Sequence, residues 1–572
     1  MAAIAQVRAA VATDCHGRDS FSPLPTATCL ALPRTRLWHS PAAASKLAQP
    51  RSDQGFSMRW ISQPGWKGNL LALFAGALTP LALAPFNIWP LALLSAALFY
   101  LGLKGLGVWR ALLRGWCYGF GAFLAGTSWI YVSIHTYGAA PVPLALFLTV
   151  GFCAGIALFF ALPAALWALC LRRNQAPLGD ALTFAGLWFA LELFRSWALT
   201  GFPWLLLGYS QLNGPLQGLA PLGGVWLISA ALAFTAALLV NAPRLIMRPL
   251  ALVAGLVLVA LPWVAGDVFK GQVWTQPAGA PLKVAGVQGN IAQELKWNPD
   301  HARATLALYR DRTAEQTDAD LVVWPENAIP VLREYVSDFL AAEGAQVAAH
   351  GGALVTGLPA RERDADGDSR YFNSITAVGN GSGTYYKQKL VPFGEYVPLQ
   401  DYLRGLIGFF DLPMSDFVRG PEQQEPLLVK GYRVAPYICY EVVYPEFVAS
   451  MAAQSQLLLT ISNDTWFGKS IGPQQHLQMA QMRALESGRW LVRVTNDGIT
   501  ALVDPFGRIS RQIPAFEVGV LQGTVVPMDG LTPYLHYRLW PLGIFSALVL
   551  LWGLLMRRQD RPEETPLVVT QS

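Results

Sequence analysis

Long apolar runs dominate the first half of the chain. Seven of them precede residue 270, at about 69–86, 88–104, 115–134, 142–170, 178–199, 222–241 and 250–266, and an eighth covers about 539–556. A helix needs about 20 apolar residues to cross the hydrocarbon core of a bilayer. The pattern therefore predicts a seven-helix transmembrane region over 58–270 and a C-terminal transmembrane helix over 538–557.

Residues 1–57 have a different pattern. They are rich in Ala, Pro, Ser and Arg and show no hydrophobic period. They also lack the apolar core that a signal peptide requires. Met58 then begins a stretch that leads directly into the first apolar run. We expect residues 1–57 to be a disordered extension, or a segment that is not translated because the natural start is Met58.

Basic residues indicate which side of the membrane each loop faces. Lys and Arg gather after the fourth, sixth and eighth runs, within 172–173, 244–248 and 557–561. Cytoplasmic loops carry an excess of these residues. We therefore expect both termini in the cytoplasm, including the tail 558–572. The long segment between the seventh and eighth runs is then on the outer side, which is the periplasm in a Gram-negative bacterium.

The end of the fifth run contains an ionisable pair. Glu192 and Arg195 are three residues apart, so they can pair on one face of a helix. Such a pair in a membrane span indicates either a functional site or a structural pair near the interface, and both interpretations stay open. The next segment, 200–221, is apolar, rich in Gly and Pro, and uncharged. It is predicted to lie in the outer interface.

From about residue 281 the pattern changes to short β-type runs that alternate with helical stretches. Helical periodicity appears at about 301–317, 331–350 and 474–487, and apolar strand-like runs separate these stretches up to about residue 530. Strands interleaved with helices predict a single α/β domain over 281–530. A domain of this length can bury its own core.

Composition supports a membrane protein and excludes other classes. Of the 572 residues, 53% are hydrophobic and 14% are charged, whereas soluble chains carry about 25% charged residues. The net charge of +5 is small, and no basic stripe interleaved with aromatics appears, so we expect no nucleic-acid partner. The six cysteines show no metal-ligand spacing. We expect no metal and no cofactor.

Three polar residues end, or closely follow, buried-type runs of the outer domain. They are Glu326 in "LVVWPEN", Lys387 in "YYKQKLVPFGEYVP" and Cys439 in "YICYE". Singly, each has a structural explanation: a turn cap, a solvated edge lysine and a core cysteine. Together they can perform acyl transfer. The carboxylate takes the thiol proton, the thiolate attacks a carbonyl, and the lysine with the N–H of Tyr440 stabilises the oxyanion.

The same three motifs resemble, in order, the Glu-Lys-Cys motifs of the nitrilase superfamily. Together with the apolar runs on both sides, and with "LTISNDTWFGKSIGPQQHLQMAQMRALESGRWLVRVTNDGITALVDPFG", the chain is similar to the apolipoprotein N-acyltransferase family of Gram-negative bacteria. The resemblance implies a polytopic α-helical membrane protein with about eight transmembrane helices and an inserted nitrilase-like α-β-β-α sandwich domain. It covers the chain from about Met58 to residue 556.

By motif, the resemblance implies that Glu326 is the general base, Lys387 the oxyanion-stabilising lysine and Cys439 the nucleophile. The supporting residues it implies are Glu395, Tyr440 and Glu441. The residues that match positions near the lipid entrance are Trp297, Asn373, Trp466 and Phe467. Core packing or anchoring at the interface also explains the aromatic residues among them. Lys389, two residues after Lys387, is taken as a neighbour rather than the catalyst.

The resemblance also implies a function. The enzyme would move the sn-1 acyl chain of a phospholipid, with phosphatidylethanolamine the expected donor, onto Cys439 as a thioester. The acceptor would be the α-amine of a diacylglyceryl-cysteine apolipoprotein, in a ping-pong cycle. We expect a monomer in the bacterial inner membrane. The alternatives are a membrane-anchored amidase or nitrilase that uses water, a transporter whose outer domain only binds solute, and an inactive scaffold.

Overall fold

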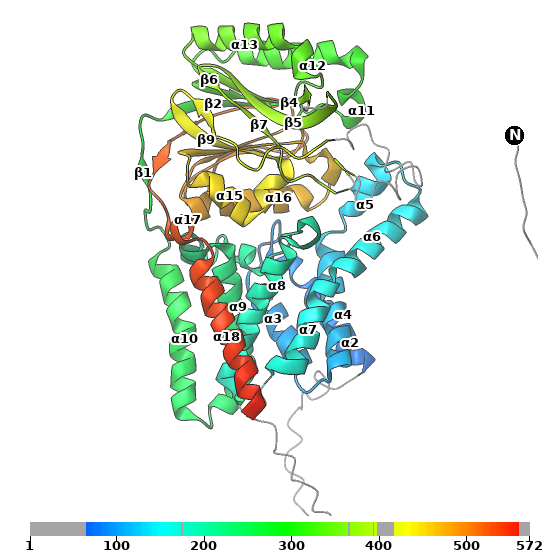
Figure 1. Cartoon of the computed structure of the whole chain (residues 1–572), viewed down its shortest axis with the longest axis vertical. Coiled ribbons are helices and arrows are strands. Elements are labelled where there is room, and N and C mark those ends of the chain that lie inside the picture. Colours follow the sequence, from blue (N-terminus) through cyan, green and yellow to red (C-terminus); the bar gives the residue numbers. More distant parts are fainter. Residues whose placement is uncertain (1–64, 173–175, 364–366, 393, 397–416, 560–572) are drawn as a thin grey trace, which may run out of the picture. The chain divides into compact units, whose positions relative to one another are not determined.

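The computed structural model describes residues 65–172, 176–363, 367–392, 394–396 and 417–559. The predicted extension 1–57 lies outside these residues, as does most of the predicted tail 558–572, from residue 560 on. The chain forms two regions, a bundle of apolar helices and an α/β sandwich (Figure 1). The sandwich is inserted in the sequence before the last helix of the bundle.

The helical region contains apolar helices joined by short 3₁₀ and π turns. Its helices are α2 (Trp66–Ala77), α3 (Pro90–Leu103), α4 (Val108–Gly126), α5 (Ile130–Val132), α6 (Val142–Ile156), α7 (Leu158–Leu166), α8 (Pro177–Arg195), α9 (Ala220–Leu245), α10 (Pro249–Val268) and α18 (Trp540–Gln559). The joining turns are η1 (Pro80–Ala82), η2 (Ser133–Tyr137), η3 (Trp167–Leu171), η4 (Ala198–Thr200), η5 (Leu207–Gln211) and η6 (Gln217–Leu219).

In the described part of the chain, four helical stretches are long and apolar enough to cross a membrane. They are Val142–Leu171, Pro177–Arg195, Gln217–Leu245 and Pro249–Val268. A fifth candidate, Val108–Gly126 with Ile130–Tyr137, bends by 62° at its break. The stretches Pro90–Leu103 and Trp540–Met556 are apolar but shorter. Several membrane-crossing helices are therefore present, whereas the count of eight stays a prediction.

Prolines explain why the first apolar run is not one long helix. The run predicted at 69–86 forms α2 and then η1, which begins at Pro80. Proline has no N–H to donate and its ring clashes with the preceding turn, so it ends a helix. The third run also differs, since α4 begins at Val108 and ends at Gly126 instead of running over 115–134. Hydropathy averaged along the chain does not detect these breaks.

The segment after α8 is mostly buried against the rest of the protein, and its position in the outer interface stays a prediction. Glu192 accepts hydrogen bonds from Trp188 Nε1 and Leu207 N, both at 2.9 Å. Arg195 donates to the carbonyl of Trp204. Glu192 and Arg195 therefore each bond to the segment that follows, and within the described residues no hydrogen bond or salt bridge joins the two side chains.

The described residues of the α/β sandwich form two large β-sheets and one two-stranded pair. The described strands of the first follow the order β14 (Gly519–Val525), β2 (Leu282–Gln288), β3 (Leu321–Val323), β4 (Ala353–Arg363), β5 (Ser369–Gly379), β7 (Thr384–Tyr386). Those of the second follow the order β13 (Ile509–Ile513), β12 (Thr500–Val503), β11 (Leu491–Thr495), β10 (Leu457–Ser462), β9 (Tyr432–Ile438), β8 (Leu427–Val429), β6 (Gly381–Ser382). The short β1 (Gln276–Pro277) pairs with β15 (Met528–Asp529).

The sheets are stacked and covered by helices on both outer faces, which confirms the expected α-β-β-α layers. Helices α12 (Pro299–Ala314) and α13 (Ser337–Ala349) cover the first sheet. Helices α15 (Pro445–Ala452) and α16 (Gly472–Ser487) cover the second and lie between it and the helical region (Figure 1). Strands β2, β3 and β4 are parallel, as are β9, β10 and β11. All six residues of β10 are buried, as expected of a strand covered on both faces.

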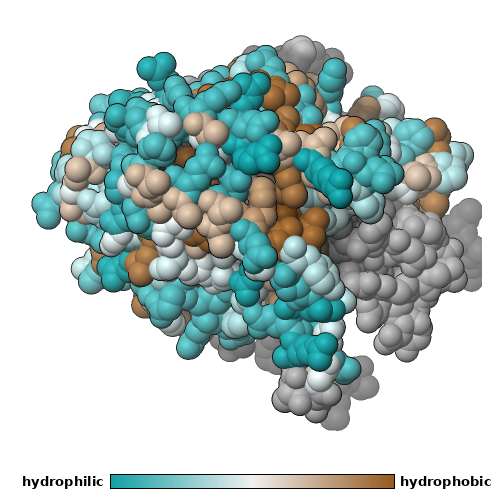
Figure 2. All heavy atoms as spheres, turned by 90° about the horizontal axis from the view of Figure 1, so that it is seen from above, coloured by the Kyte–Doolittle hydropathy of each residue, from teal (hydrophilic) through white to brown (hydrophobic). Residues whose placement is uncertain are grey.

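The two regions differ in the surfaces they expose. Seen from the side of α12 and α13, the sandwich is mainly hydrophilic (Figure 2). Helix α10, in contrast, exposes large apolar side chains along its length, including Leu250, Val253, Leu256, Leu261 and Val264. Water suits the first surface and lipid the second.

The sandwich is joined to the helices by a buried hydrogen bond. Helix α9 is irregular near its start, where Gly224 has φ +67°, a conformation that glycine adopts at little cost. The N–H of Val225 donates to Glu486 of α16 at 2.7 Å, and Arg483 pairs with that carboxylate at 2.8 Å. This contact holds the sandwich directly over the helical region.

Candidate active site

The three predicted catalytic residues follow three different strands and meet in space. Glu326 comes three residues after β3, Lys387 directly after β7, and Cys439 directly after β9. Lys387 Nζ lies 3.4 Å from Glu326 Oε1, and the charges of both act on the Cys439 thiol. Strand ends of an α/β domain project side chains into one crevice. The structure places the three residues together, although their catalytic roles stay a prediction.

A buried cluster surrounds the lysine. Lys387 Nζ donates to Glu395 Oε1 at 2.8 Å. Asn373 Nδ2 donates to both carboxylates, at 2.7 Å to Glu326 Oε1 and 3.0 Å to Glu395 Oε1. Burial alone lowers the pKa of Lys387, but Glu395 and Glu326 outweigh it and raise the pKa above its usual value. The ammonium therefore stays charged and is aimed by two carboxylates.

Glu326 is arranged to accept one more proton. Its Oε1 accepts from Lys387 and Asn373, and its Oε2 accepts from the N–H of Asn463 at 2.8 Å. A carboxylate has about four acceptor positions on its two oxygens. The described contacts occupy three of them, so Oε2 keeps a position for a proton from a thiol or an amine.

Cys439 has the backbone conformation of a constrained nucleophile. Its φ is +52°, in the left-handed region that non-glycine residues adopt at a cost and that clusters at active sites. The residue is partly exposed. Burial raises the pKa of the Cys439 thiol, Glu326 adds to this effect, and Lys387 opposes it. The resting residue is therefore a thiol, and it needs a base to attack.

Glu441 connects the lysine loop with the cysteine turn. Its buried Oε1 accepts from Tyr385 Oη at 2.9 Å, Gln388 N at 2.6 Å and Lys389 N at 3.0 Å. Its Oε2 accepts from Ile438 N at 2.8 Å. Burial raises the pKa of Glu441 to about 7, against the lowering effect of the N–H donors. This carboxyl sets the distance between Lys387 and Cys439 because it bonds to the backbone beside each.

The cysteine turn also contacts the helical region. Tyr440 Oη donates to the carbonyl of Gly201 at 3.3 Å. Tyr444 Oη lies 3.0 Å from the same oxygen and 3.1 Å from the carbonyl of Thr200. Neighbouring Leu199 is 91% exposed. The cysteine turn therefore rests against a loop of the helical region that presents an apolar side chain outward.

Two residues predicted near the lipid entrance lie against the bent stretch formed by Val108–Gly126 and Ile130–Tyr137. The ring of Phe467 is 4.6 Å from that of Trp129, and it is buried. Trp466 is partly exposed, its ring is 5.9 Å from that of Tyr137, and its carbonyl accepts from Ser133 Oγ at 2.7 Å. Both contacts join the loop after β10 to the segment around α5. A role in lipid entry stays a prediction for both.

The other two residues of that set are placed differently. Asn373 is fully buried on β5 and bonds to the two carboxylates, so it belongs to the catalytic cluster. Trp297 is partly buried and follows α11 (Gln293–Lys296). Its neighbour Lys296 is buried and donates to the carbonyl of Glu326 at 2.8 Å. Burial lowers the pKa of Lys296 to about 8.

Sequence reasoning missed Lys296 and a second buried group, Asp464, His476 and Arg493. His476 Nδ1 lies 3.0 Å from Asp464 Oδ1, and Arg493 Nη2 lies 2.6 Å from Asp464 Oδ2. Asp464 and His476 are within the long segment that carries the family resemblance, so the signal was present but not assigned. Arg493 is also within that segment, but it is in the apolar strand β11, where no hydrophobic pattern marks it.

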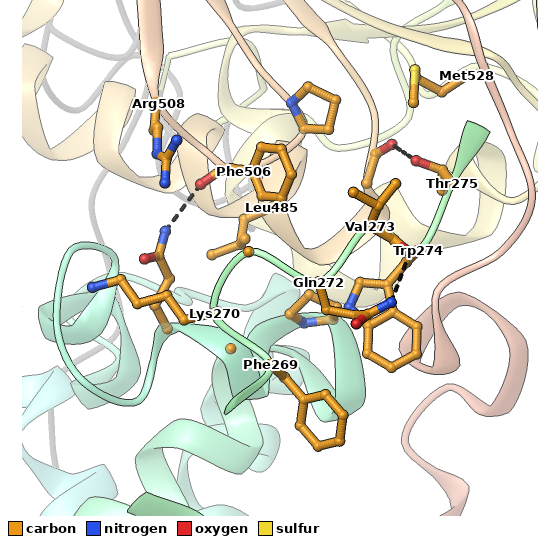
Figure 3. A pocket seen from close by; sticks show the side chains of 16 residues that line it. Phe269, Lys270, Gln272, Val273, Trp274, Thr275, Leu485, Phe506, Arg508 and Met528 are labelled. Atoms are coloured by element: carbon orange, nitrogen blue, oxygen red, sulfur yellow. Dashed lines mark hydrogen bonds between the residues drawn. The ribbon is translucent and has the colours of Figure 1, made fainter. Parts of the chain in front are cut away.

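A separate cavity of about 80 Å³ lies at the end of α10. It is lined by Phe269, Lys270, Trp274, Phe506 and Arg508 among others (Figure 3). Beside it, a hydrogen bond from Gln217 Nε2 to the carbonyl of Phe506 joins the two regions, and one from Thr275 Oγ1 to the carbonyl of Gly488 joins the segment after α10 to the sandwich. None of the three predicted catalytic residues lines it among the described residues, so it is not part of the active site. No described group of His, Cys, Asp and Glu side chains could hold a metal ion.

Comparisons with known proteins agree on both regions. Residues 75–238 match the apolipoprotein N-acyltransferase N-terminal domain, and residues 283–529 match the carbon-nitrogen hydrolase domain. The second match covers the sandwich that holds Glu326, Lys387 and Cys439.

Curated relatives match over nearly their whole length. The chain is 68% identical over 510 residues to the apolipoprotein N-acyltransferase of Pseudomonas paraeruginosa PA7, covering 89% of this chain and 100% of that protein. It is 64% identical to the protein of the same name from Pseudomonas syringae pv. tomato, over 88% of this chain and 99% of that one. The corresponding Coxiella burnetii protein is 42% identical, over 84% and 99%.

Proposed function

The chain belongs to the apolipoprotein N-acyltransferase family, and we propose that it N-acylates lipoproteins with Glu326, Lys387 and Cys439 as catalytic residues. The observation that carries the proposal is the meeting of a thiol on a constrained turn, a charged lysine and a carboxylate with a free acceptor position. These are the groups that acyl transfer through a thioester requires.

The first half-reaction acylates the enzyme. Glu326 Oε2 takes the thiol proton as Sγ of Cys439 attacks the ester carbonyl of a phospholipid, at the sn-1 chain. A C–S bond forms, and the carbonyl oxygen becomes an oxyanion between Lys387 Nζ and the Tyr440 N–H. The ester C–O bond then breaks, the leaving oxygen takes the proton from Glu326, and a lysophospholipid departs. Loss of one oxyanion donor costs roughly a hundredfold to a thousandfold in rate.

The second half-reaction forms the amide. The α-amine of a diacylglyceryl-cysteine lipoprotein attacks the thioester carbonyl, and Glu326 takes a proton from the nitrogen. The C–N bond forms and the C–S bond breaks. The Cys439 thiolate recovers the proton from Glu326. The same oxyanion donors serve both steps, so one site completes a ping-pong cycle.

Attachment of the catalytic domain to membrane helices suits both lipid substrates. Drawing an acyl chain into water costs about 0.8 kcal/mol per CH₂. The contacts of Tyr440 and Tyr444 with the loop at Thr200–Gly201 hold the nucleophile beside the helical region, which shortens the path from the bilayer. The proposal includes eight spans, cytoplasmic termini, a periplasmic sandwich in the inner membrane, phosphatidylethanolamine as donor and a monomeric enzyme.

A membrane-anchored amidase would use the same residues with water as acceptor. The names of the matched relatives favour the transferase. The transferase and the amidase form the same acyl-enzyme but release different products from it. A transferase passes the chain to an amine, whereas an amidase releases a free fatty acid.

The test supplies both acceptors at once. Purified protein in detergent receives phosphatidylethanolamine with a labelled sn-1 chain and a diacylated lipopeptide, and mass spectrometry follows the label. We expect the label on the lipopeptide amine with wild type, and no transfer with Cys439→Ala, Glu326→Gln or Lys387→Met. Label found only in free fatty acid would favour the amidase. Transfer by folded Cys439→Ala would refute the catalytic assignment.

A further inference from the structure

A buried imidazole contacts the backbone of the nucleophile. His476 lies on α16 and is 1% exposed. Its Nε2 is 3.1 Å from the carbonyl oxygen of Cys439. On its other side, Nδ1 is 3.0 Å from Asp464 Oδ1 and 3.1 Å from Arg493 Nη2. The catalytic steps above assign no role to these groups.

The direction of the hydrogen bond follows from its partners. A carbonyl oxygen only accepts, so Nε2 must carry the hydrogen and donate to Cys439. Burial and then Arg493 lower the pKa of His476, whereas Asp464 opposes them. Nδ1 faces both the Asp464 carboxylate and the Arg493 guanidinium. Asp464, held by Arg493 and by Ser462 Oγ at 2.6 Å, fixes this arrangement.

Planarity of the peptide bond carries the effect across the turn. The carbonyl of Cys439 and the N–H of Tyr440 belong to one peptide unit, and in a trans peptide they point in opposite directions. The only cis bond of the described chain is Ala84–Pro85, so this peptide is trans. A bond that holds the carbonyl toward α16 therefore holds the N–H toward the opposite side.

We propose that His476 is a positioning residue that orients the Cys439–Tyr440 peptide, so that the Tyr440 N–H points at the developing oxyanion. The proposal rests on Cys439 being the nucleophile. His476 touches neither lipid nor reacting atoms, and it acts through the peptide that it holds.

One feature of the site requires such a support, and a second shows how the imidazole is held in place. The φ of +52° at Cys439 is a conformation that its surroundings must maintain. The imidazole itself is held by rings on two sides, with the Phe467 ring at 5.7 Å and the Trp204 ring at 6.2 Å. Because Trp204 belongs to the segment after α8, the support for the oxyanion donor reaches into the helical region.

Two amide variants separate the hydrogen bond from the fold. Both replace the ring with a neutral polar side chain. The Gln amide nitrogen reaches about as far as Nε2, so His476→Gln can still donate to Cys439. The Asn amide nitrogen reaches about as far as Nδ1, so His476→Asn cannot. His350, exposed beside α13, provides the control His350→Asn.

The assay compares two reactions of the same thiol. Single-turnover acylation by phosphatidylethanolamine in detergent, read by intact mass, passes through an oxyanion. Alkylation by iodoacetamide forms a C–S bond, breaks a C–I bond and builds no oxyanion; its rate is read at the peptide that contains Cys439. A displaced peptide slows only the first reaction, whereas a displaced thiol or a damaged fold slows both.

We expect His476→Asn to acylate more slowly by up to roughly a hundredfold, which is the lower end for loss of one oxyanion donor. We expect His476→Gln and His350→Asn to stay near wild type and all variants to alkylate at the wild-type rate. Equal loss in both reactions, unchanged acylation in His476→Asn, or equal slowing by Gln and Asn would each overturn the proposal. Wild type that is alkylated but never acylated would instead refute the proposed function.

Discussion

The contact between Glu395 and Lys387 offers the sharpest perturbation of the buried cluster. Their charged atoms are 2.8 Å apart, against 3.4 Å for Lys387 and Glu326. With an effective dielectric constant of about 20, the gross attraction is roughly 6 kcal/mol for the first pair and 5 kcal/mol for the second. Glu395 is therefore the stronger of the two described partners, and it keeps the ammonium from closing on the base.

Glu395→Gln keeps the shape of the side chain and removes this charge. Its amide oxygen can still accept from Lys387, but its NH₂ group faces the N–H of Val391, which donates to Oε2 at 2.9 Å in the native protein. Breaking a buried pair costs about 3–5 kcal/mol. Since Glu326 remains as a partner for Lys387, we take about 3 kcal/mol, which is roughly a hundredfold in rate if it falls on acylation.

Single-turnover acylation and thermal unfolding in detergent measure this effect. We expect acylation to fall roughly a hundredfold and the unfolding temperature to decrease, while the phospholipid concentration for half-saturation stays constant. The matched control is Glu315→Gln, because Glu315 pairs with Arg312 on α12 at 3.6 Å and is exposed. Such a pair contributes little. If Glu395→Gln acylates within threefold of wild type, the cluster does not position the lysine.

Three further predictions concern the neighbouring groups. Glu441→Ala removes the acceptor of four hydrogen bonds, those donated by Tyr385, Gln388, Lys389 and Ile438. The rate of acylation should therefore fall at least roughly a hundredfold. A near-normal rate would contradict the role of Glu441 in connecting the lysine loop with the cysteine turn. Between pH 4.5 and about 7 the folded protein holds a Glu441 proton that the unfolded chain has released. Its contribution to the unfolding free energy therefore decreases as pH rises through that window, and Glu441→Gln should lack this slope in pH-dependent denaturation. Lys296→Met removes the donor to the Glu326 carbonyl and should slow acylation roughly tenfold without lowering the unfolding temperature; an unchanged rate would show that the turn holds without it.

The proximity of the three residues predicted to be catalytic could be foreseen because each follows a run of buried residues. Glu326, Lys387 and Cys439 are polar groups directly after or near the ends of β3, β7 and β9, and the strand-end argument placed them together correctly. Asn373 could not be found in this way. It is a buried polar residue inside strand β5, and only the sheet register brings it beneath the two carboxylates.

His476 shows a second limit. Helix α16 packs on the second sheet with one face and on the helical region with the other, so its polar residues are buried too. Periodicity assigns polar positions of a helix to water, and this assignment fails for a helix covered on both sides. The bounds predicted for the apolar helices differ from the observed ones for another reason. A hydropathy average does not detect proline breaks or a 62° bend.

The acyl-enzyme itself tests the central claim most directly. Purified protein is incubated with phosphatidylethanolamine, and intact mass is compared for wild type, Cys439→Ser and Cys439→Ala. The account predicts one added acyl chain on wild type, at Cys439, removed by hydroxylamine and discharged by a diacylated lipopeptide, and no thioester on Cys439→Ala. Folded wild-type protein that gains no acyl chain from any phospholipid, or gains one that Cys439→Ala also carries, would contradict it.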